Sequence, residues 1–229
     1  MNYIFEGVIG AFHLLLAKDP ETYSAIWTTL RLSTLSITCT LIVGIPLGFL
    51  LGHYNFPGKR AVRTLVDTLL ALPTVVIGLL VYAFISRRGP LGDLGLLFTI
   101  PGVAIGQFIL ALPIVVSLTA SAIEGIDPKI YLTLRTLGAS DMQAALSSMW
   151  EGRYAITAAA VTAYSRVISE VGVSMMIGGN IKWHTRTITT AIALETGKGE
   201  FSMGIALGIV LLAFALTANT LVSSLRRRA

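Results

Sequence analysis

Four long runs without a charged residue constrain this chain more than any other feature. They extend over Leu32 to Gly52, Thr68 to Ser86, Leu94 to Ile123 and Phe201 to Leu225. A helix needs about 20 predominantly apolar residues to cross the hydrocarbon core of a bilayer. With 54% hydrophobic and 13% charged residues, the composition is also too apolar for an ordinary soluble domain. The sequence therefore predicts an all-α polytopic membrane protein.

A fifth span is predicted between the third and fourth of these runs, although it carries Arg166 and Glu170, because the topology requires another crossing. The transmembrane domain is predicted over 26–225, with a polar segment over 124–153. Its five spans cover about 28–52, 66–86, 97–121, 154–177 and 201–224. The last four residues, 226–229, form a predicted basic tail in the cytoplasm.

The N-terminal segment, 1–25, is predicted to lie outside the bilayer core. Its first uncharged run is short and has no basic start, which argues against both a signal peptide and a span. Apolar residues nevertheless recur at helical spacing and predict a helix in the membrane interface. These residues are Ile4, Phe5, Val8, Ile9, Phe12, Leu15 and Leu16.

The net charge of +5 does not indicate a nucleic-acid partner, because the basic residues are spread over short predicted loops. The three arginines at 226–228 predict a cytoplasmic C-terminus, so five spans put the N-terminus outside. Nine basic residues then lie inside and seven outside. The outer seven are Lys18, Arg31, Arg87, Arg88, Lys182, Arg186 and Lys198. Attraction of an anionic solute and chance loop composition are both open explanations for this basic outer face.

Glycines and prolines are placed regularly in the apolar runs. Gly44, Gly48 and Gly52 repeat every four residues. Two further glycine pairs have the same spacing: Gly102 with Gly106, and Gly204 with Gly208. Small residues at this spacing let helices approach closely, and packing within one subunit is favoured over a dimer contact. Prolines inside the runs, at 46, 73 and 113, predict kinks.

Catalytic and metal-binding patterns are missing from the sequence. The single Cys39 and the scattered His13, His53 and His184 do not form a ligand set. A phosphate-binding loop would require glycine at position 192, where the chain has isoleucine, and Ser or Thr at 199, where it has glycine. We therefore expect no cofactor, no metal and no enzymatic activity in this chain.

The polar segment 124–153 carries signals for two short helices. Asp127 with Pro128 marks a helix start, and Gly138 marks its end. Ser140 with Gln143 forms a capping box that starts the second helix. An apolar edge on such a pair suits docking into a groove of a partner protein, and a helix lying on lipid headgroups is the open alternative.

A polar stripe is predicted on the fourth span, formed by Thr162, Arg166, Ser169, Glu170 and Ser174. Because an unpaired charge in the bilayer costs at least about 2.5 to 3.5 kcal/mol, Arg166 and Glu170 should pair or face water. Two interpretations stay open: a purely structural ion pair, and a pair that lines a pathway.

The segment after this span is rich in hydrogen-bond donors. It contains Gly178, Gly179, Asn180, Lys182, His184, Thr185, Arg186, Thr187, Thr189 and Thr190. A deprotonated oxyanion only accepts hydrogen bonds, so amides, hydroxyls and arginine are the groups that it would need. A bare polar outer loop is the alternative.

The run Leu134-Arg135-Thr136-Leu137-Gly138-Ala139-Ser140 resembles the EAA coupling loop of type I ABC importer permeases. Leu132, Thr133, Leu134 and Glu151 depart from the usual motif, whereas its central glycine is intact. The resemblance implies the type I ABC importer transmembrane fold, in which this loop docks into a separate ATPase subunit. The implied coupling residues are Leu134, Arg135, Leu137, Gly138, Ala139, Ser140 and Asp141.

Four further strings look like the permeases for tungstate, and more loosely like those for molybdate and sulfate. They are Ser169-Glu170-Val171-Gly172, Gly178-Gly179-Asn180-Ile181, His184-Thr185-Arg186-Thr187 and Leu194-Glu195-Thr196-Gly197-Lys198-Gly199. The resemblance implies an inner-membrane pathway enclosed by two copies of the chain, an extracytoplasmic tungstate-binding protein, and two ATPase subunits that hold ATP and magnesium. The implied pathway or gate candidates are Arg166, Ser169, Glu170, Ser174, Asn180, Thr185, Arg186 and Thr187.

Two other functions stay open at this stage. The same machinery would serve molybdate or sulfate, because selection largely rests with the binding protein. An ion-gradient transporter would use Arg166 and Glu170 as a relay, but such folds usually contain internal repeats and this sequence has none that is convincing.

Overall fold

The structure is a computed structural model, which describes residues 2–227. Within this range, residues 2–4 and 128 are described by their backbone alone. All regular secondary structure in this range is helical. Arg228 and Ala229 of the predicted tail lie outside the described residues, as do the side chains of Ile4 and Pro128. The predicted all-α class is confirmed.

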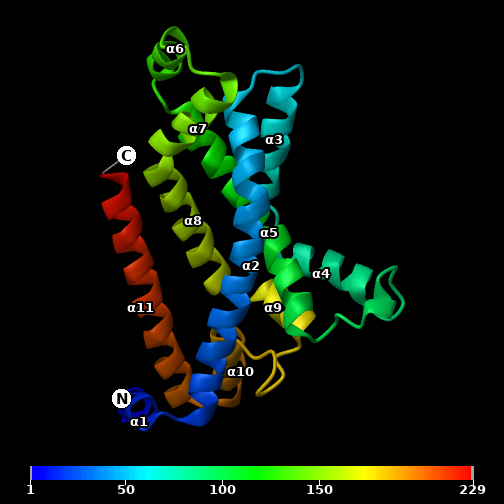
Figure 1. Cartoon of the computed structure of the whole chain (residues 1–229). Coiled ribbons are helices and arrows are strands. Elements are labelled where there is room, and N and C mark those ends of the chain that lie inside the picture. The colour runs from blue at the N-terminus through cyan, green and yellow to red at the C-terminus, as the bar shows by residue number, and fades with distance from the viewer. Residues whose placement is uncertain (1, 228–229) are drawn as a thin grey trace.

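Three helices are long and apolar enough to cross a membrane: α2 (Pro20–His53), α5 (Ile100–Glu124) and α11 (Phe201–Arg226). They run along the length of the bundle in Figure 1. Helix α2 begins earlier than the predicted span because the Asp19 carboxylate accepts a hydrogen bond from Thr22 N at 2.8 Å and caps it. Its 34 residues correspond to about 51 Å, so α2 extends beyond the bilayer core.

The predicted close approach of helices occurs between α2 and α5. A Cβ added at Gly48 would lie 2.6 Å from Thr119 Cβ and 2.7 Å from the Val116 carbonyl oxygen, and one at Gly52 would lie 2.7 Å from the Ala120 carbonyl oxygen. The two backbones are therefore in contact along the glycine face. By contrast, no atom in the described part of the chain lies within 4 Å of a Cβ added at Gly208 on α11.

The predicted span 66–86 is not one continuous helix. It falls on α3 (Lys59–Leu70) and α4 (Thr74–Ile85), which are bent by 97° relative to each other. Pro73 lies at the break with an extended backbone and caps α4. Its ring removes one backbone donor and disfavours helical geometry in the residue before it, which explains the bend. The pair counts as a fourth candidate span, and five crossings stay a prediction.

The predicted span 154–177 is also interrupted. Helix α8 (Arg153–Ile168) ends before Ser169, and the short α9 (Gly172–Gly178) follows. A Cβ on Gly172 would lie 2.7 Å from Thr74 Oγ1, so the start of α9 packs tightly on the start of α4. The prediction of a single polar stripe on one helix is therefore wrong.

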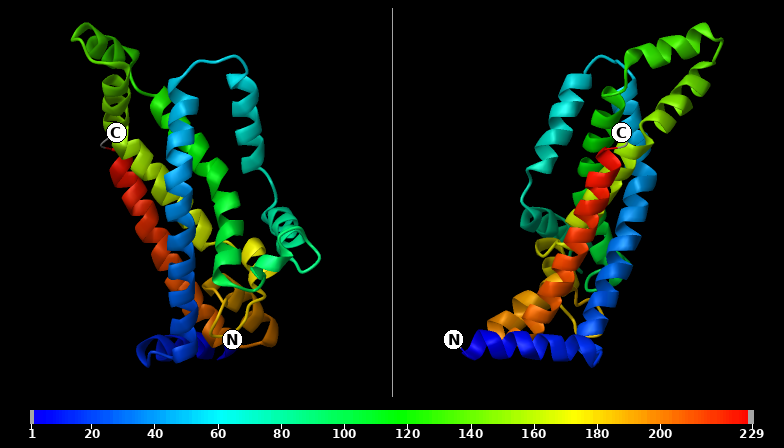
Figure 2. Two further views of the ribbon diagram at one scale, coloured as in Figure 1. Left: turned by 45° about the vertical axis from the view of Figure 1, so that its right-hand side comes forward. Right: turned by 90° about the vertical axis from the view of Figure 1, so that its left-hand side faces the viewer.

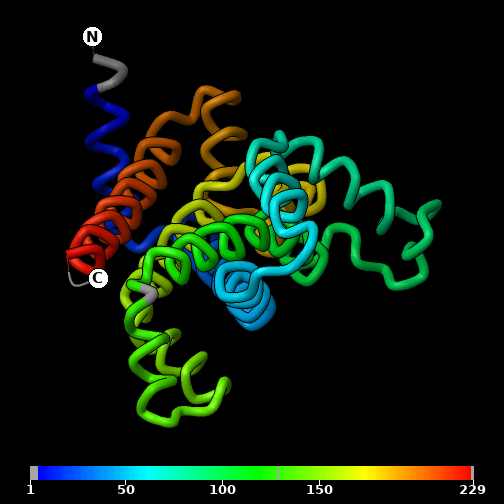
Figure 3. The backbone as a smooth tube through the Cα atoms, turned by 90° about the horizontal axis from the view of Figure 1, so that it is seen from above, coloured from blue at the N-terminus to red at the C-terminus, as the bar shows by residue number. Residues whose placement is uncertain are grey.

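The remaining helices occupy opposite ends of the bundle. Helices α6 (Pro128–Thr136) and α7 (Asp141–Glu151) lie at one end, and α1 (Asn2–Leu16) and α10 (Ile188–Lys198) at the other (Figures 1 and 2). Helix α1 runs crosswise to the long helices and exposes Phe5, Ile9, Phe12 and Leu16, as an interfacial helix would. A short 3-10 turn, Gly92–Leu94, follows α4. Seen from above, α4 and this turn extend away from the bundle (Figure 3).

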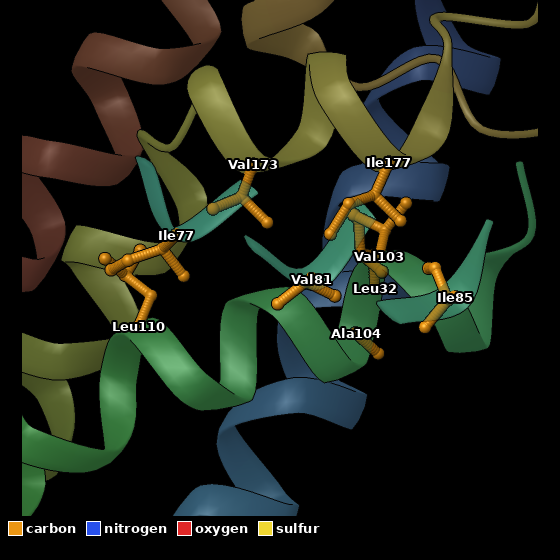
Figure 4. Packing of buried hydrophobic residues seen from close by; sticks show 9 residues of the cluster. All are labelled: Leu32, Ile77, Val81, Ile85, Val103, Ala104, Leu110, Val173 and Ile177. Atoms are coloured by element: carbon orange, nitrogen blue, oxygen red, sulfur yellow. The ribbon is translucent and has the colours of Figure 1, made fainter. Parts of the chain in front are cut away.

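The largest buried cluster joins α2, α4, α5 and α9 near the break between α8 and α9 (Figure 4). This cluster brings together apolar side chains of three neighbouring helices. They include Val103 and Leu110 of α5, Ile77 and Val81 of α4, and Val173 and Ile177 of α9. This packing fixes α9 between the two neighbouring helices and so positions the polar residues at its ends.

Candidate functional site

The polar segment 124–153 forms the predicted pair of capped helices. Asp127 accepts a hydrogen bond from Lys129 N at 2.9 Å and starts α6. Ser140 and Gln143 form the predicted capping box of α7. Gly138 links the two helices with a φ of +86°, a backbone conformation that favours glycine. The predicted local structure is thus confirmed.

The turn between α6 and α7 is held by Arg135. Its guanidinium lies 2.7 Å from the Asp141 carboxylate and donates to the Ala139 carbonyl oxygen at 3.0 Å. Among the residues that the structure describes, none lies within 4 Å of a Cβ added at Gly138, so the turn is open there. The side chains of Leu137, Met142, Leu146 and Trp150 are exposed beside it. The helix pair therefore presents an uncovered apolar edge.

The inner side of α7 packs on the long helices. Ala145 is buried with Phe49 of α2, Ile123 of α5 and Ile156 of α8, and Met149 packs against this cluster. A displacement of α7 would therefore be transmitted directly to three helices of the bundle.

Glu170 lies in the break between α8 and α9. Its carboxylate accepts a hydrogen bond from Arg166 Nη1 at 2.8 Å and another from Val173 N at 3.2 Å. Its backbone carbonyl accepts from Thr189 Oγ1 at 2.7 Å. The predicted pairing of Arg166 with Glu170 is present, and the same carboxylate caps α9. Ser169 is exposed beside this pair.

Ser174 is buried and contacts a residue that the sequence patterns did not single out. Gln107 Nε2 of α5 donates to Ser174 Oγ at 3.3 Å, and both side chains are buried. Gln107 Oε1 has no hydrogen-bond partner within the described residues. The sequence did contain a signal for Gln107, because it is the one amide side chain in the charge-free run from Leu94 to Ile123.

The loop between α9 and α10 uses most of its donors internally. Thr185 Oγ1 donates to the Gly178 carbonyl and accepts from Ile181 N. Asn180 Nδ2 donates to the Thr190 carbonyl at 3.2 Å. The Thr187 hydroxyl caps α10, and Ile188 N donates to Thr29 Oγ1 of α2 at 2.8 Å. The structure thus gathers four of the predicted gate candidates, Asn180, Thr185, Arg186 and Thr187, in this loop, with the hydroxyl groups of the two threonines engaged.

Arg186 is the best-buried cation of this loop. It pairs with Glu21 of α2 and lies 3.4 Å from the Glu195 carboxylate of α10. Lys182 also pairs with Glu21, and Lys198 lies 3.0 Å from Glu195. The sequence patterns did not identify either glutamate as a partner, because Glu21 is 165 residues away along the chain and Glu195, at nine residues, is not at the three- or four-residue spacing of a helical pair. The cluster links the start of α2 to the end of α10 through the loop.

The candidate site residues form two groups that lie in different parts of the bundle. Arg166, Glu170, Ser174 and Gln107 lie at the interrupted helix, whereas the Arg186 cluster lies at the α10 end. Among residues 2–227 no three His, Cys, Asp or Glu side chains lie close enough to hold a metal. The roles of the predicted pathway and coupling residues stay predictions.

The fold and these groups define a class: an all-helical, multi-span membrane protein with an exposed helix pair at one end and an ion-pair cluster at the other. Residues 44–229 match the family model described as "Binding-protein-dependent transport system inner membrane component". The chain belongs to this family of inner-membrane permeases.

Similar proteins agree with this assignment. The chain is 48% identical to the tungstate uptake system permease protein TupB of Campylobacter jejuni, covering 99% of this chain and 95% of that one. It is 39% identical to TupB of Peptoclostridium acidaminophilum, with 99% of both chains covered. The solved MetNI methionine ABC transporter, in an inward-facing conformation, matches with a TM-score of 0.70 at 17% identity, covering 90% and 96% of the two chains. The chain therefore has the predicted type I ABC importer transmembrane fold.

Proposed function

We propose that this chain is the permease subunit of an ATP-driven importer for tungstate. The observation that carries the proposal is the 48% identity, over nearly the whole chain, to a tungstate uptake permease. The linked strings from Ser169 to Gly199 lie in the region where such a permease would contact its solute. Hydrolysis of ATP takes place in a separate subunit, since this chain contains no phosphate-binding loop.

In this proposal α6 and α7 are the cytoplasmic coupling element. The exposed apolar edge at Leu137, Met142 and Trp150 fits a groove on the ATPase subunit. The contact of Ala145 with α2, α5 and α8 then carries the movement of the ATPase into the bundle. The same assignment places the C-terminus in the cytoplasm and the α1–α10 end outside.

The pathway lies between two copies of the chain, with the outer gate at the α9–α10 loop. In this proposal an extracytoplasmic binding protein delivers the oxyanion to this end, and the description of the family as binding-protein-dependent supports a partner of this kind. Asn180, Thr185, Arg186 and Thr187 supply donors there once the gate rearranges, because tungstate only accepts hydrogen bonds.

The proposal is tested by reconstituting the permease with its cognate ATPase and binding protein in vesicles, and measuring uptake of tungstate by mass spectrometry. We expect uptake that requires ATP and that sulfate does not inhibit at equal concentration. Uptake driven by an ion gradient without ATP would assign the chain to secondary transporters. Preferred uptake of molybdate or sulfate would move it to another oxyanion.

A further inference from the structure

A large apolar groove opens in the angle between α3 and α4. It has a volume of about 820 Å³ and is lined by nineteen residues of α2 to α5 and the adjoining loops, all apolar. Leu50, Leu80 and Phe84 on its walls are each about half exposed. The volume falls in the range of small-molecule sites, which is about 300 to 1,000 Å³. The groove therefore has the size and the lining to hold an apolar chain.

A cationic hollow adjoins the groove at the α6–α7 end. It has a volume of about 730 Å³ and is lined by Lys59, Arg60, Arg63, Asn55, Phe56, Gly58, Thr64 and Glu124. Phe56 lines both the groove and the hollow, so the two spaces are neighbours at this side chain. Helix α3 accounts for the arrangement, because it carries the three cations in its first two turns and also Val62 and Leu69 of the groove.

The charges of the hollow are not balanced. Glu124 is the one carboxylate among its lining residues, and it pairs with Lys59 at 3.2 Å and with Arg63 at 3.4 Å. Arg63 also lies 3.3 Å from the Asp67 carboxylate. Arg60 is exposed and makes no ion pair within the part of the chain that the structure describes. A positive charge is therefore available at the mouth of an apolar groove.

We propose that the groove and the hollow together bind an anionic phospholipid. An acyl chain lies along the apolar wall between α3, α4 and α5, and the phosphate lies against Arg60. Anionic headgroups are attracted to basic residues at the membrane surface, and long basic side chains reach that level from an apolar stem. A second copy of the chain is the competing occupant of the groove, and the charge of Arg60 favours the lipid, because one such lipid supplies both an anion and an apolar chain.

The test uses the full-length permease in phosphatidylcholine vesicles that contain a photoactivatable phosphatidylglycerol with its reactive group on the acyl chain. Labelled peptides are mapped by mass spectrometry. We expect labelling of α3, α4 and α5 peptides that line the groove, and about fivefold less labelling with the corresponding phosphatidylcholine probe. Arg60→Glu should reduce labelling by the anionic probe to a similar extent. Arg88→Glu, which reverses an exposed arginine in the loop after α4, is the matched control and should not.

Leu80→Trp provides a second variant, because a larger side chain fills the groove without changing the charge. It should reduce labelling by both probes. Equal labelling by the two probes, or full labelling of Arg60→Glu by the anionic probe, would overturn the proposal. Rapid disulfide formation between two copies of Leu80→Cys, in a Cys39→Ser background, would also overturn it, because the groove would then be covered by a second copy.

Discussion

The Glu170 carboxylate lies 2.8 Å from Arg166 Nη1, yet the two side chains differ in environment: that of Glu170 is 2% exposed and that of Arg166 is 43% exposed. The carboxylate is thus the buried partner, and the cation connects it to a more accessible space. Because Glu170 also caps α9, this pair holds together the two halves of the interrupted helix.

Arg166→Ala should impair folding more than the double change Arg166→Ala with Glu170→Gln. The single change leaves a buried carboxylate without its cation, whereas the glutamine of the double variant is neutral and still accepts from Val173 N. Breaking a fully buried pair costs about 3–5 kcal/mol, and the partial exposure of Arg166 makes the expected cost smaller. The yield of monodisperse protein from membranes measures the difference.

Glu170→Gln alone is the control for this comparison, since it removes the charge and keeps the shape. We expect its yield to match that of the double variant. If Arg166→Ala gives the same yield as both, the pair does not contribute to folding.

Helix type and order followed from the sequence because bilayer-spanning helices require long apolar runs. The two interrupted spans did not follow. Pro73 indicated a kink but not its size, since the 97° bend depends on how α4 packs against α9. The break at Ser169 has no proline, and it rests on the Glu170 carboxylate bonding Val173 N and on the packing of Gly172 against Thr74.

The caps of α6 and α7 were predictable because capping is local: each donor and acceptor lies within three residues of its partner. The ion pair of Arg166 with Glu170 was predictable for the same reason. The partners of Arg186 were not, because Glu21 and Glu195 are brought to it by the tertiary fold. Composition predicted a donor-rich loop, but it did not reveal that these donors would be satisfied within the protein.

Gly48→Ala should destabilise the contact between α2 and α5. The added Cβ would lie 2.6 Å from Thr119 Cβ and 2.7 Å from the Val116 carbonyl oxygen, and a backbone atom cannot move aside cheaply. Overpacking of this kind costs about 1–3 kcal/mol. Thermal unfolding in detergent should show a lower midpoint. Gly208→Ala, where no atom of the described residues lies within 4 Å, should not lower the midpoint, because alanine is the better helix former. An equal shift in both variants would exclude a steric cause.

Arg186→Met should also lower the unfolding midpoint, since it leaves Glu195 buried without its nearest buried cation. The Arg186 and Glu195 side chains are 9% and 7% exposed, so a loss of up to about 3–5 kcal/mol is expected. Lys198→Met is the matched control: it removes the other cation of Glu195, but that lysine is 51% exposed and its loss should cost about 1 kcal/mol or less. If the lysine variant were the less stable one, Arg186 would not anchor the cluster.

Gly138→Leu should abolish ATP-driven uptake while the protein still reaches the membrane. No atom of the described residues lies within 4 Å of the added Cβ, so the cost to the fold is the backbone strain at φ +86°, about 1–2 kcal/mol. The side chain would instead obstruct the close approach of the turn to the ATPase, and we expect uptake to fall about tenfold or more. Gly95→Leu is the matched control, because Gly95 has a positive φ and an equally open Cβ position outside the α6–α7 turn. Normal uptake by Gly138→Leu, measured with tungstate in reconstituted vesicles, would show that this turn does not couple the bundle to ATP hydrolysis. A parallel loss in Gly95→Leu would trace the effect to backbone strain.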